Sequence, residues 1–331
     1  MDETPVVLVT GGAGYIGSHA VLALQDASFP VVVFDNLSTG IRSAVPDGVP
    51  LIEGDIADTE HVAEVIRGFQ VGAIMHFAGS IVVSESVEKP LKYYRNNTQN
   101  SLGLIETCVR LGVKHFIFSS TAAVYGEPEA YPIDEESPTR PINPYGQSKL
   151  MTEHMLRDAS AAHGLNTGIL RYFNVAGADP AGRAGQNTPA ATHLIKVAVQ
   201  AALGLRPAIS VFGTDYDTPD GTCIRDYVHV MDLVDAHVKG LEWLRAGRGS
   251  RVFCLGTGSG FSVREVVDAT RHVTNRPVPM VDGPRRGGDA VKLVCGSTRA
   301  KAELGWEPGR STMKQMIGDA WRWHQNGTYQ A

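Results

Sequence analysis

The feature that most restricts the fold of this sequence is a glycine-rich turn directly after its first apolar run. Val6–Thr10 leads at once into Gly11-Gly12-Ala13-Gly14-Tyr15-Ile16-Gly17, and Ile16–Asp26 then has the apolar spacing of a helix. A strand that turns this sharply into a helix needs glycines, which adopt positive φ and let backbone N–H groups approach a ligand. The pattern predicts a strand–turn–helix unit that holds a pyrophosphate at a helix N-terminus.

The context of the turn strengthens this interpretation. With 36 glycines in 331 residues, about 0.4 matches to Gly-x-x-Gly-x-x-Gly arise by chance, so the motif alone is weak. Asp35 ends the second apolar run, where a carboxylate accepts hydrogen bonds from ribose hydroxyls and repels a 2′-phosphate, which favours NAD over NADP. The cofactor-binding residues expected at this and the following strand ends are Gly11, Gly14, Tyr15, Ile16, Gly17, Asp35, Asn36, Asp55, Ile56, Phe77, Ala78 and Gly79.

Strand and helix patterns alternate through the first half of the chain. This alternation predicts an α/β fold with a doubly wound parallel sheet of Rossmann type. The expected strands are Val6–Thr10, Val31–Asp35, Leu51–Glu53, Ala73–Phe77, Phe116–Ser119 and Thr167–Tyr172, and the expected helices are Ile16–Asp26, Thr59–Arg67, Leu91–Leu111 and Pro144–Ala162. We expect a first domain over residues 1–176.

The second half reads as a smaller, mixed lobe rich in loops. Helical patterns occur at Thr192–Leu203, Met231–Leu244, Ser262–His272 and Thr312–Gln325, between turn-dense stretches such as Val211–Thr222. Loops of this kind commonly carry substrate contacts. We expect residues 177–331 to form a substrate-binding lobe, with some segments returning to the first domain.

Composition excludes several classes of function. The formal net charge is −5 and no basic block occurs, which argues against a nucleic-acid or membrane-surface partner. No apolar run approaches the ~18 residues of a membrane span, and the N-terminal stretch has no signal-peptide core. The four cysteines lie far apart without a C-x-x-C pair, which favours buried thiols in a reducing cytoplasm and no metal site.

A second motif brings together groups suited to proton transfer. Tyr145 and Lys149 stand at i and i+4, on one face of the helix that Pro144 helps to start. A free phenol has a pKa of ~10, so a nearby ammonium and a positive nicotinamide ring are needed to favour the phenolate near neutral pH. Thr121 follows the expected strand Phe116–Ser119, where its hydroxyl can hydrogen-bond a reacting oxygen.

The glycine turn, the Tyr145/Lys149 pair and Thr121 together resemble the extended short-chain dehydrogenase/reductase superfamily. Longer strings resemble the UDP-glucose 4-epimerase family within it, spread from residue 6 to about residue 325. These strings are GGAGYIGSH (11–19), HFAG (76–79), ESVEKP (85–90), FSSTAAVYG (118–126), NPYGQSK (143–149), LRYFN (170–174), DGT-x-x-RDY-x-HV-x-D (220–232) and RRGGD (285–289).

The resemblance implies an isomerase that keeps NAD bound and epimerises a UDP sugar at C4, and it implies a homodimer. Tyr145 would be the base, Lys149 would lower its pKa and hold the nicotinamide ribose, and Thr121 would bind the 4-oxygen. Further cofactor contacts implied are Asn96, Ser119 and Tyr172. Substrate contacts implied, besides Thr121, are Asn174, His193, Leu194, Phe212, Arg225, Tyr227, Arg286, Asp289 and Leu293.

Four positions depart from the family pattern. Ile81 stands where many members have a cofactor-contacting lysine, His193 replaces an asparagine near the sugar, and RRGGD has Gly287 in place of glutamate. Leu293 stands where a tyrosine often limits the sugar pocket. The resemblance implies UDP-glucose and UDP-galactose as the substrates. Because of these departures, a UDP-N-acetylhexosamine or a UDP-pentose is the alternative.

Related chemistries remain as competing interpretations. Dehydratases and decarboxylases of this superfamily carry acidic residues directly after the Thr or Ser, whereas this chain has Ala122-Ala123, which cannot move a proton. A net NAD-dependent oxidoreductase would have to exchange its cofactor at every turnover. A non-catalytic NAD sensor would typically lack the tyrosine or lysine, and both are present here.

Overall fold

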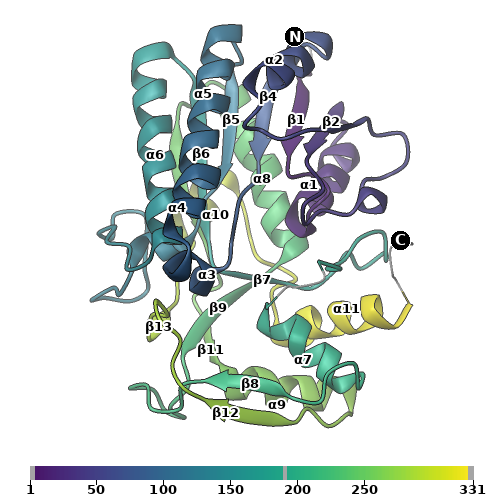
Figure 1. The fold of residues 1–331 in the computed structure, drawn as a ribbon, viewed down its shortest axis with the longest axis vertical. Helices are drawn as coiled ribbons and strands as arrows, with labels where there is room; N and C mark the ends of the chain where they lie inside the picture. The colour runs from purple at the N-terminus through teal and green to yellow at the C-terminus, as the bar shows by residue number, and fades with distance from the viewer. Residues whose placement is uncertain (1–3, 189–191, 327–331) are drawn as a thin grey trace.

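A seven-stranded parallel sheet organises the larger lobe of the computed structural model, which describes residues 4–188 and 192–326 (Figure 1). The strand order is β10-β6-β5-β4-β1-β2-β3, and every neighbouring pair is parallel. The strands are β1 (Val6–Thr10), β2 (Val31–Asp35), β3 (Leu51–Glu53), β4 (Val71–His76), β5 (His115–Ser119), β6 (Asn166–Tyr172) and β10 (Arg251–Leu255). The order reverses between β1 and β4, and sheets of this kind bind ligands at the strand ends beside that reversal.

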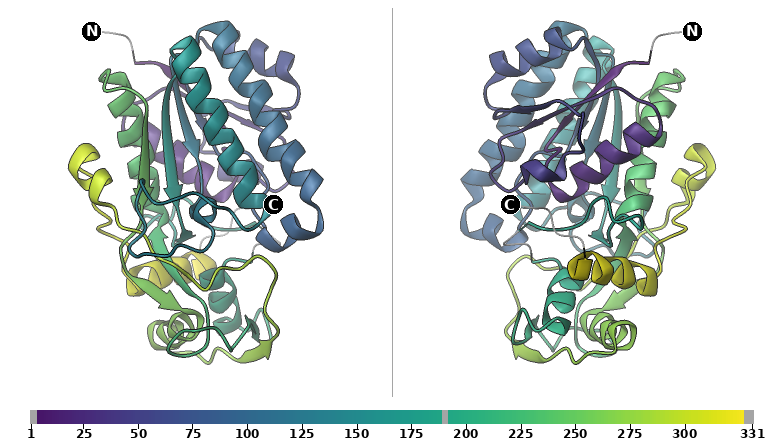
Figure 2. Two further views of the ribbon diagram at one scale, coloured as in Figure 1. Left: turned by 90° about the vertical axis from the view of Figure 1, so that its left-hand side faces the viewer. Right: turned by 90° about the vertical axis from the view of Figure 1, so that its right-hand side faces the viewer.

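Helices cover both faces of this sheet (Figure 2). One face packs against α1 (Tyr15–Asp26) and α8 (Val230–Arg245). The other face packs against α2 (Thr59–Gly68), α5 (Asn100–Leu111) and α6 (Pro144–His163). Asp58 caps α2, accepting the His61 N–H at 3.1 Å. The doubly wound α/β fold predicted from the sequence is confirmed.

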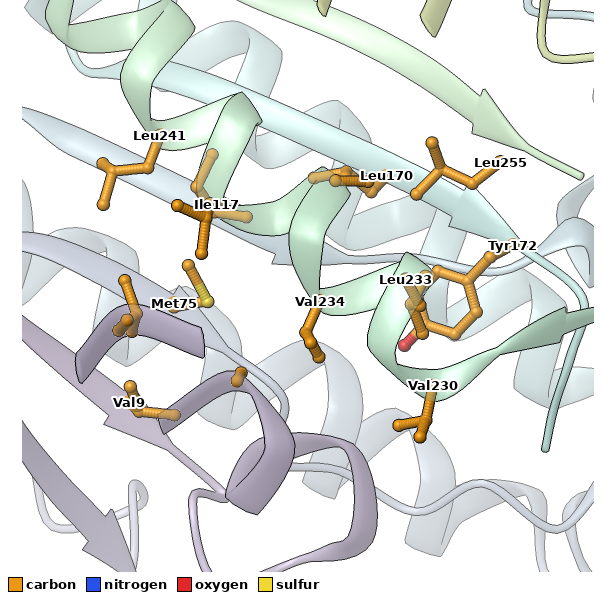
Figure 3. Packing of buried hydrophobic residues seen from close by; sticks show 14 of the residues in the cluster. Val9, Met75, Ile117, Leu170, Tyr172, Val230, Leu233, Val234, Leu241 and Leu255 are labelled. Atoms are coloured by element: carbon orange, nitrogen blue, oxygen red, sulfur yellow. The ribbon is translucent and has the colours of Figure 1, made fainter. Parts of the chain in front are cut away.

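The core of the larger lobe is built from β-branched and leucine side chains of the strands and α8. In Figure 3, Leu233, Val234 and Leu241 of α8 lie over Ile117 and Leu170 of the sheet. All five are fully shielded from solvent, and burying each such side chain contributes roughly 1.5–3 kcal/mol. This packing fixes α8, and with it the connection to the smaller lobe.

The smaller lobe contains two further sheets below the first (Figure 1). In one, β9 (Ile224–His229) pairs with β7 (Asn174–Ala176) and β13 (Lys292–Leu293) in parallel and with β11 (Gly260–Ser262) in antiparallel orientation. In the other, β8 (Ile209–Phe212) and β12 (Met280–Gly283) form a parallel pair. Helices α7 (Leu194–Ala202), α9 (Val263–Thr274) and α11 (Met313–Asn326) pack together against this lobe's strands.

The second half of the chain contributes to both lobes. Strand β10 hydrogen-bonds with β6 at the edge of the large sheet, and α8 packs on α1. The short helix α10 (Thr298–Leu304) lies beside β10 and α8. Among the described helices, none combines the length and the apolar character needed to cross a bilayer.

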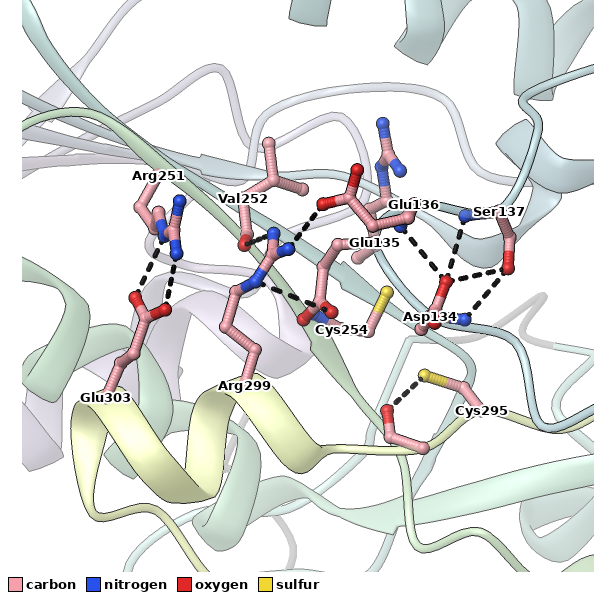
Figure 4. A network of polar contacts seen from close by, with 12 residues as sticks. Asp134, Glu135, Glu136, Ser137, Arg251, Val252, Cys254, Cys295, Arg299 and Glu303 are labelled. Atoms are coloured by element: carbon pink, nitrogen blue, oxygen red, sulfur yellow. Dashed lines mark hydrogen bonds and ion pairs between the residues drawn. The ribbon is translucent and has the colours of Figure 1, made fainter.

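Charged groups fasten the segment 126–143 to the edge of the large sheet (Figure 4). Arg299 of α10 donates to Glu136 at 2.5 Å, and the Glu135 carboxylate accepts the Cys254 N–H at 2.6 Å. This segment joins the short 3-10 turn after β5 to the start of α6. These contacts therefore hold the middle of the segment against β10 and α10.

One expectation about secondary structure is wrong in detail. Residues 91–111 are not one α-helix: α4 (Pro90–Tyr93) and α5 are separated by a π-helical stretch, Tyr94–Gln99. Asn97 in this stretch bonds Ser80 and Ser148, so tertiary hydrogen bonds replace the regular helical spacing.

The strands of the second half were not predicted either. The turn-dense stretch Val211–Thr222 begins inside β8, and β9 carries several polar residues. These strands are short and polar, so their apolar pattern is weak. All four cysteines are buried and free, as the spacing predicts.

Candidate active site

The glycine turn between β1 and α1 closes too tightly for side chains. Gly11 has a φ of 73°, and a Cβ there would lie 2.6 Å from the Ala78 nitrogen. A Cβ at Gly17 would lie 2.1 Å from the Gly11 carbonyl oxygen. Gly14 precedes α1 and has no side chain to cap it, so the first N–H groups of the helix face an open end. The turn has the backbone cradle that a pyrophosphate requires.

Asp35 ends β2 beside this turn and is buried. Its Oδ2 accepts the Ala13 N–H at 2.9 Å and its Oδ1 accepts the Leu37 N–H at 2.8 Å. Burial raises the pKa of this carboxyl, while the two backbone hydrogen bonds lower it. Each oxygen retains a lone pair for a ribose hydroxyl. Asn36 donates to Asp55 at 2.8 Å, so the polar residues predicted after β2 and β3 lie side by side.

The turn after β4 is joined to the glycine turn. The Phe77 and Ala78 N–H groups both donate to the Thr10 carbonyl, at 2.9 and 3.1 Å. A Cβ on Gly79 would lie 3.8 Å from the Lys149 Nζ, so this turn also reaches the candidate catalytic helix. The other predicted cofactor residues at this end are Tyr15, Ile16 and Ile56, all buried or half-buried.

Helix α6 begins with an N-cap residue followed by a proline. Asn143 is the N-cap and accepts the Gly146 N–H at 2.8 Å, and Pro144 occupies the first helical position. A Cβ on Gly146 would lie 2.4 Å from the Ala123 carbonyl oxygen. The glycine therefore lets the first turn of α6 rest directly on the 3-10 turn Ala122–Tyr125.

This contact brings Tyr145 to Thr121. The Thr121 hydroxyl accepts the Ala123 N–H at 3.1 Å and lies near enough to the Tyr145 phenol to affect its pKa. Burial raises the pKa of Tyr145, and the hydrogen bond from Thr121 lowers it. The two residues that the sequence paired as base and hydroxyl partner are thus neighbours in the structure.

Lys149 lies one helical turn further along α6 and is buried. Its ammonium donates to the Ser119 carbonyl at 3.0 Å and lies 4.8 Å from the centre of the Phe118 ring. Burial lowers the pKa of Lys149 to about 8, an effect that the nearby Glu153 carboxylate opposes. Lys149 is held by the end of β5, and the effects that set the pKa of Tyr145 are burial and Thr121. Lys149 is not among these effects, so its influence on the pKa of the phenol stays a prediction.

Ser119 and Tyr172 meet at the ends of the adjacent strands β5 and β6. Their hydroxyls are hydrogen-bonded to each other. Burial raises the pKa of Tyr172, whereas the hydrogen bond to Ser119 lowers it. Both residues were expected to contact the cofactor, and both lie around the strand end that holds Lys149.

Sequence reasoning missed a buried ion pair behind this cluster. Glu153 accepts from Arg171 at 2.9 and 2.5 Å and from the Ser120 hydroxyl at 2.6 Å, and Arg171 also donates to the Tyr125 hydroxyl at 2.9 Å. Glu153 and Arg171 are almost fully buried. The available signal was spacing, since Tyr145, Lys149 and Glu153 recur every four residues on one face of α6.

The π-helical stretch Tyr94–Gln99 lies against the turn after β4. Asn96 donates to the Ser80 hydroxyl at 3.0 Å. The Asn97 side chain accepts the Ser80 N–H and donates to the Ser80 carbonyl. Ile81, which stands where the family has a lysine, is half exposed. The amides therefore anchor this turn, and Asn96 bonds the residue that follows the candidate cofactor residue Gly79.

Four predicted nucleotide-binding residues converge in the smaller lobe. The Arg286 guanidinium lies 4.5 Å from the centre of the Phe212 ring and donates to Asp289 at 2.9 Å. Arg225 of β9 lies 4.0 Å from the same carboxylate. Two guanidinium groups near one carboxylate, one of them over an aromatic ring, suit a diphosphate attached to a planar base.

The loop that carries Arg286 is tied to the catalytic helix. Asn143, the N-cap of α6, donates from Nδ2 to the Gly288 carbonyl at 3.2 Å. Leu293 pairs in register with Arg225 and packs against the buried cluster that contains Ala122. These contacts join the start of α6, which carries Tyr145, to the loop of the smaller lobe that carries Arg286.

The remaining predicted substrate residues are spread more widely. Asn174 starts β7 beside Tyr227 of β9, but the Tyr227 side chain is buried in the apolar cluster with α7 and α11. His193 precedes α7, and its Nδ1 hydrogen-bonds Gln186 at 2.7 Å. Burial lowers the pKa of His193 to about 4, so its ring is neutral at physiological pH. Leu194 opens α7 and is partly buried in the same cluster as Tyr227.

Comparison with known proteins identifies relatives over the whole chain. A family model described as the NAD dependent epimerase/dehydratase family matches residues 7–256. The UDP-glucose 4-epimerase of Azospirillum brasilense is 60% identical over 328 residues, which cover 98% of this chain and 94% of that protein.

Solved structures agree with the sequence relatives. The UDP-glucose 4-epimerase of Bifidobacterium longum, in complex with NAD+ and UDP, superposes with a TM-score of 0.91 at 36% identity and covers 97% of this chain and 98% of its own. The UDP-Glc/GlcNAc 4-epimerase of Campylobacter jejuni has a TM-score of 0.83 at 45% identity and covers 97% and 99%. The chain therefore belongs to the NAD dependent epimerase/dehydratase family.

Proposed function

We propose that this protein is a UDP-glucose 4-epimerase that interconverts UDP-glucose and UDP-galactose with tightly bound NAD. The observation that carries the proposal is the placement of Tyr145 near Thr121 at the start of α6, whose cap Asn143 also bonds the arginine loop at Gly288. A proton-transfer pair and a diphosphate-binding loop are thus joined through one helix end. Sequence identity of 60% and 46% to two UDP-glucose 4-epimerases, over 98% and 96% of this chain, supports the same function.

The residues present fit a dinucleotide. Side chains are excluded at Gly11 and Gly17, the first turn of α1 is uncapped, and the buried Asp35 retains acceptor capacity. Asn96, Ser119, Lys149 and Tyr172 would surround the nicotinamide end. When bound, NAD supplies the hydride acceptor and donor for C4 of the sugar. The substrate must then present both faces of C4 in turn, which requires the sugar to rotate about its diphosphate link.

Tyr145 acts in this proposal as the acid–base group at the sugar 4-oxygen. To do so near neutral pH, its pKa must fall from the free phenol value of ~10 toward about 7. The Thr121 hydrogen bond favours the phenolate, and the Lys149 ammonium adds positive charge one turn away. The Glu153 carboxylate opposes the loss of that charge on burial, so it helps to keep Lys149 protonated.

The diphosphate would be held by Arg225 and Arg286. Asp289 would accept hydrogen bonds from the ribose, and the Phe212 ring, already stacked under Arg286, would border the uracil. Asn174 and Leu194 complete the proposed contacts with the nucleotide sugar, and Tyr227 would support them from the core behind β9. Because both phosphates carry charge, guanidinium forks supply the main recognition.

Elimination and decarboxylation are disfavoured by the residues after Thr121. Ala122 is buried in an apolar cluster and Ala123 turns its carbonyl toward Gly146. Neither can accept a proton from C5 of the sugar. A reaction confined to C4 is therefore favoured.

A second candidate is a 4-epimerase for a bulkier or smaller UDP sugar. The observation that favours it is Leu293, which packs against the cluster behind Thr121 and stands where the family often has tyrosine. A leucine leaves more room than a tyrosine beside the sugar. His193, neutral and bonded to Gln186, is the other proposed sugar contact that departs from the family.

We further propose a homodimer in the cytoplasm. Leu102 of α5 and Met151 of α6 are exposed on the outer helices of the large lobe, where a second copy could cover them. The four buried free thiols are typical of a reducing compartment. Light scattering of the purified protein tests the dimer directly.

The decisive experiment uses the purified protein without added cofactor. UDP-galactose, UDP-N-acetylgalactosamine and UDP-arabinose are incubated separately, and the products are resolved by chromatography. We expect the C4 epimer of UDP-galactose and retained nicotinamide in the absorbance spectrum. A requirement for stoichiometric added NAD would indicate a net oxidoreductase, and a 4-keto-6-deoxy product would indicate a dehydratase. No change in any UDP sugar would refute the proposed function.

A further inference from the structure

Two consecutive arginines of one loop lie against two aromatic rings of another. Arg285 lies with its guanidinium carbon 4.2 Å from the centre of the Tyr216 ring, and Arg286 lies 4.5 Å from that of Phe212. The loops follow β12 and β8, which are parallel neighbours with Phe212 opposite Gly283. Because parallel strands end at the same edge, the two loops leave the sheet side by side.

Arg285 makes several specific contacts although its side chain is partly exposed. Its Nε donates to Asp215 Oδ1 at 2.7 Å and its Nη2 donates to the Asp215 carbonyl at 2.5 Å, while the ring of Tyr216 lies beneath. A Cβ on Gly213 would lie 2.5 Å from the Tyr216 ring and 2.7 Å from the Arg285 Cγ. Gly213, with a φ of 85°, is therefore what permits this close approach.

The loop on the Tyr216 side is braced by its own hydrogen bonds. The Tyr216 N–H donates to the Gly221 carbonyl at 3.0 Å, and the Thr222 hydroxyl donates to Asp220 at 2.7 Å. The opposite loop, residues 284–289, contains Gly287 and Gly288, which contribute no side chain. Adjacent glycines have wide conformational freedom, so this loop depends on contacts with its neighbours for a fixed shape.

We propose that Arg285 is a positioning residue for the nucleotide site. By clasping Asp215 and Tyr216, it holds the glycine-containing loop so that Arg286 and Asp289 are in place before the nucleotide arrives. The inference rests on the proposed function only in that Arg286 and Asp289 bind the nucleotide diphosphate and ribose. A loop that is already ordered loses less conformational entropy on binding, so the clasp increases affinity without touching the reacting atoms.

The test compares Arg285→Gln with the wild-type protein as purified with its cofactor. We expect the Kd of UDP, measured by calorimetry, and the KM for UDP-galactose both to rise about tenfold, since a cation–π contact and an ion pair are lost. The kcat and the bound nicotinamide content should stay within twofold of wild type. Arg285→Lys keeps the charge over the ring and should recover part of the affinity.

The matched control is Arg264→Gln on α9. Arg264 forms a similarly exposed ion pair with Asp282 of β12, at 3.3 Å, but belongs to no predicted binding loop. Its loss should leave the Kd of UDP unchanged. Tyr216→Leu should reproduce the defect of Arg285→Gln, and the double variant should be no worse than either single variant.

Several results would overturn the inference. An unchanged Kd of UDP in Arg285→Gln, an equal defect in Arg264→Gln, or a loss of kcat with unchanged UDP affinity would each do so. The calorimetric measurement needs no turnover. A wild-type protein that binds UDP but epimerises no sugar would therefore refute the proposed function while still testing Arg285.

Discussion

Gly146 and Ala123 approach so closely that a Cβ on the glycine would lie 2.4 Å from the Ala123 carbonyl oxygen. Tyr145 precedes this glycine, and Thr121 lies two residues before the alanine. The spacing between α6 and the 3-10 turn therefore sets how near the Tyr145 phenol lies to the Thr121 hydroxyl. Glycine at position 146 has a steric role in the site, although it makes no side-chain contact.

Replacing Gly146 with alanine should separate Tyr145 from Thr121. We expect kcat to fall by roughly 10- to 100-fold, because small displacements of catalytic groups have large kinetic effects. Overpacking should also lower stability by about 1–3 kcal/mol. The measurements are steady-state kinetics and thermal unfolding.

The control for this change is Gly318→Ala in α11. Apart from its chain neighbours and the backbone of its own helix, no heavy atom of the described chain lies within 4 Å of a Cβ built there. Alanine should stabilise the helix by up to about 1 kcal/mol and leave kcat unchanged. Wild-type kcat in Gly146→Ala would show that the contact with Ala123 does not set the site.

Tyr145→Phe should abolish turnover while leaving the fold and the bound nicotinamide nearly unchanged. The change removes only the phenolic oxygen, which is the proposed proton-transfer group. Product formation from UDP-galactose and the absorbance of retained cofactor provide the two readouts. Full activity of this variant would rule out Tyr145 as the base.

Lys149→Met should stabilise the cofactor-free fold at neutral pH. Burial lowers the pKa of Lys149 to about 8, so the folded state binds this proton less tightly than the unfolded state, where the lysine pKa is about 10.4. The native lysine therefore destabilises the fold below pH 8, by up to about 3 kcal/mol, and this cost disappears as pH rises from 8 toward 10.4.

The stability gain of Lys149→Met should accordingly shrink across that pH range in urea titrations. Lys114→Met, at an exposed site, serves as the control and should show no comparable dependence. A constant difference between Lys149→Met and wild type from pH 7 to pH 10 would contradict the assigned burial effect. The same variant should need a higher pH for activity, since the phenol loses a neighbouring positive charge.

Glu153→Gln should shift the alkaline limb of the activity profile to lower pH. The carboxylate opposes the effect of burial on Lys149, so its removal lowers the pKa of Lys149 further below its usual value. The buried Arg171 also loses its counter-charge, which should cost roughly 3–5 kcal/mol of stability. Arg157→Gln is the control, because Arg157 pairs with the same carboxylate at 3.1 Å from a half-exposed position. A pH profile unchanged from wild type would show that Glu153 does not affect the pKa of Lys149.

Leu293→Tyr should narrow the sugar site. The larger ring would occupy space beside the cluster that contains Ala122, so any activity on UDP-N-acetylgalactosamine should fall more than activity on UDP-galactose. The ratio of the two kcat/KM values is the measurement. An unaltered ratio would mean that Leu293 does not limit the sugar.

The sequence predicted the parts of the site that lie on regular, strongly patterned elements. The glycine turn, Asp35 and the Tyr145/Lys149 pair all follow buried strands, whose apolar runs are unmistakable, and the structure places them at the expected strand and helix ends. Glu153 continues the same four-residue spacing but was missed, because a buried glutamate is identified by its partner Arg171 on β6, 18 residues away.

The π-helical stretch and the strands of the smaller lobe could not be predicted from the sequence for a different reason. The irregular turn at Tyr94–Gln99 is stabilised by amide contacts to Ser80, and β9 pairs with three strands from distant parts of the chain. The apolar pattern continues through Tyr94–Gln99 without marking the change of helix type, and β9 has only a weak pattern of its own. Tyr227 illustrates the consequence: it was assigned to the substrate by motif, and its side chain lies in the core.

By itself the sequence determined the doubly wound fold and the chemical groups available for proton transfer, because hydrophobic periodicity and glycine turns act over a few residues. Only the tertiary structure decided which groups meet, such as Thr121 with Tyr145, Asn143 with Gly288 and Arg285 with Tyr216. Those contacts join segments that are far apart in the chain, and their geometry depends on how helices, strands and loops pack against one another.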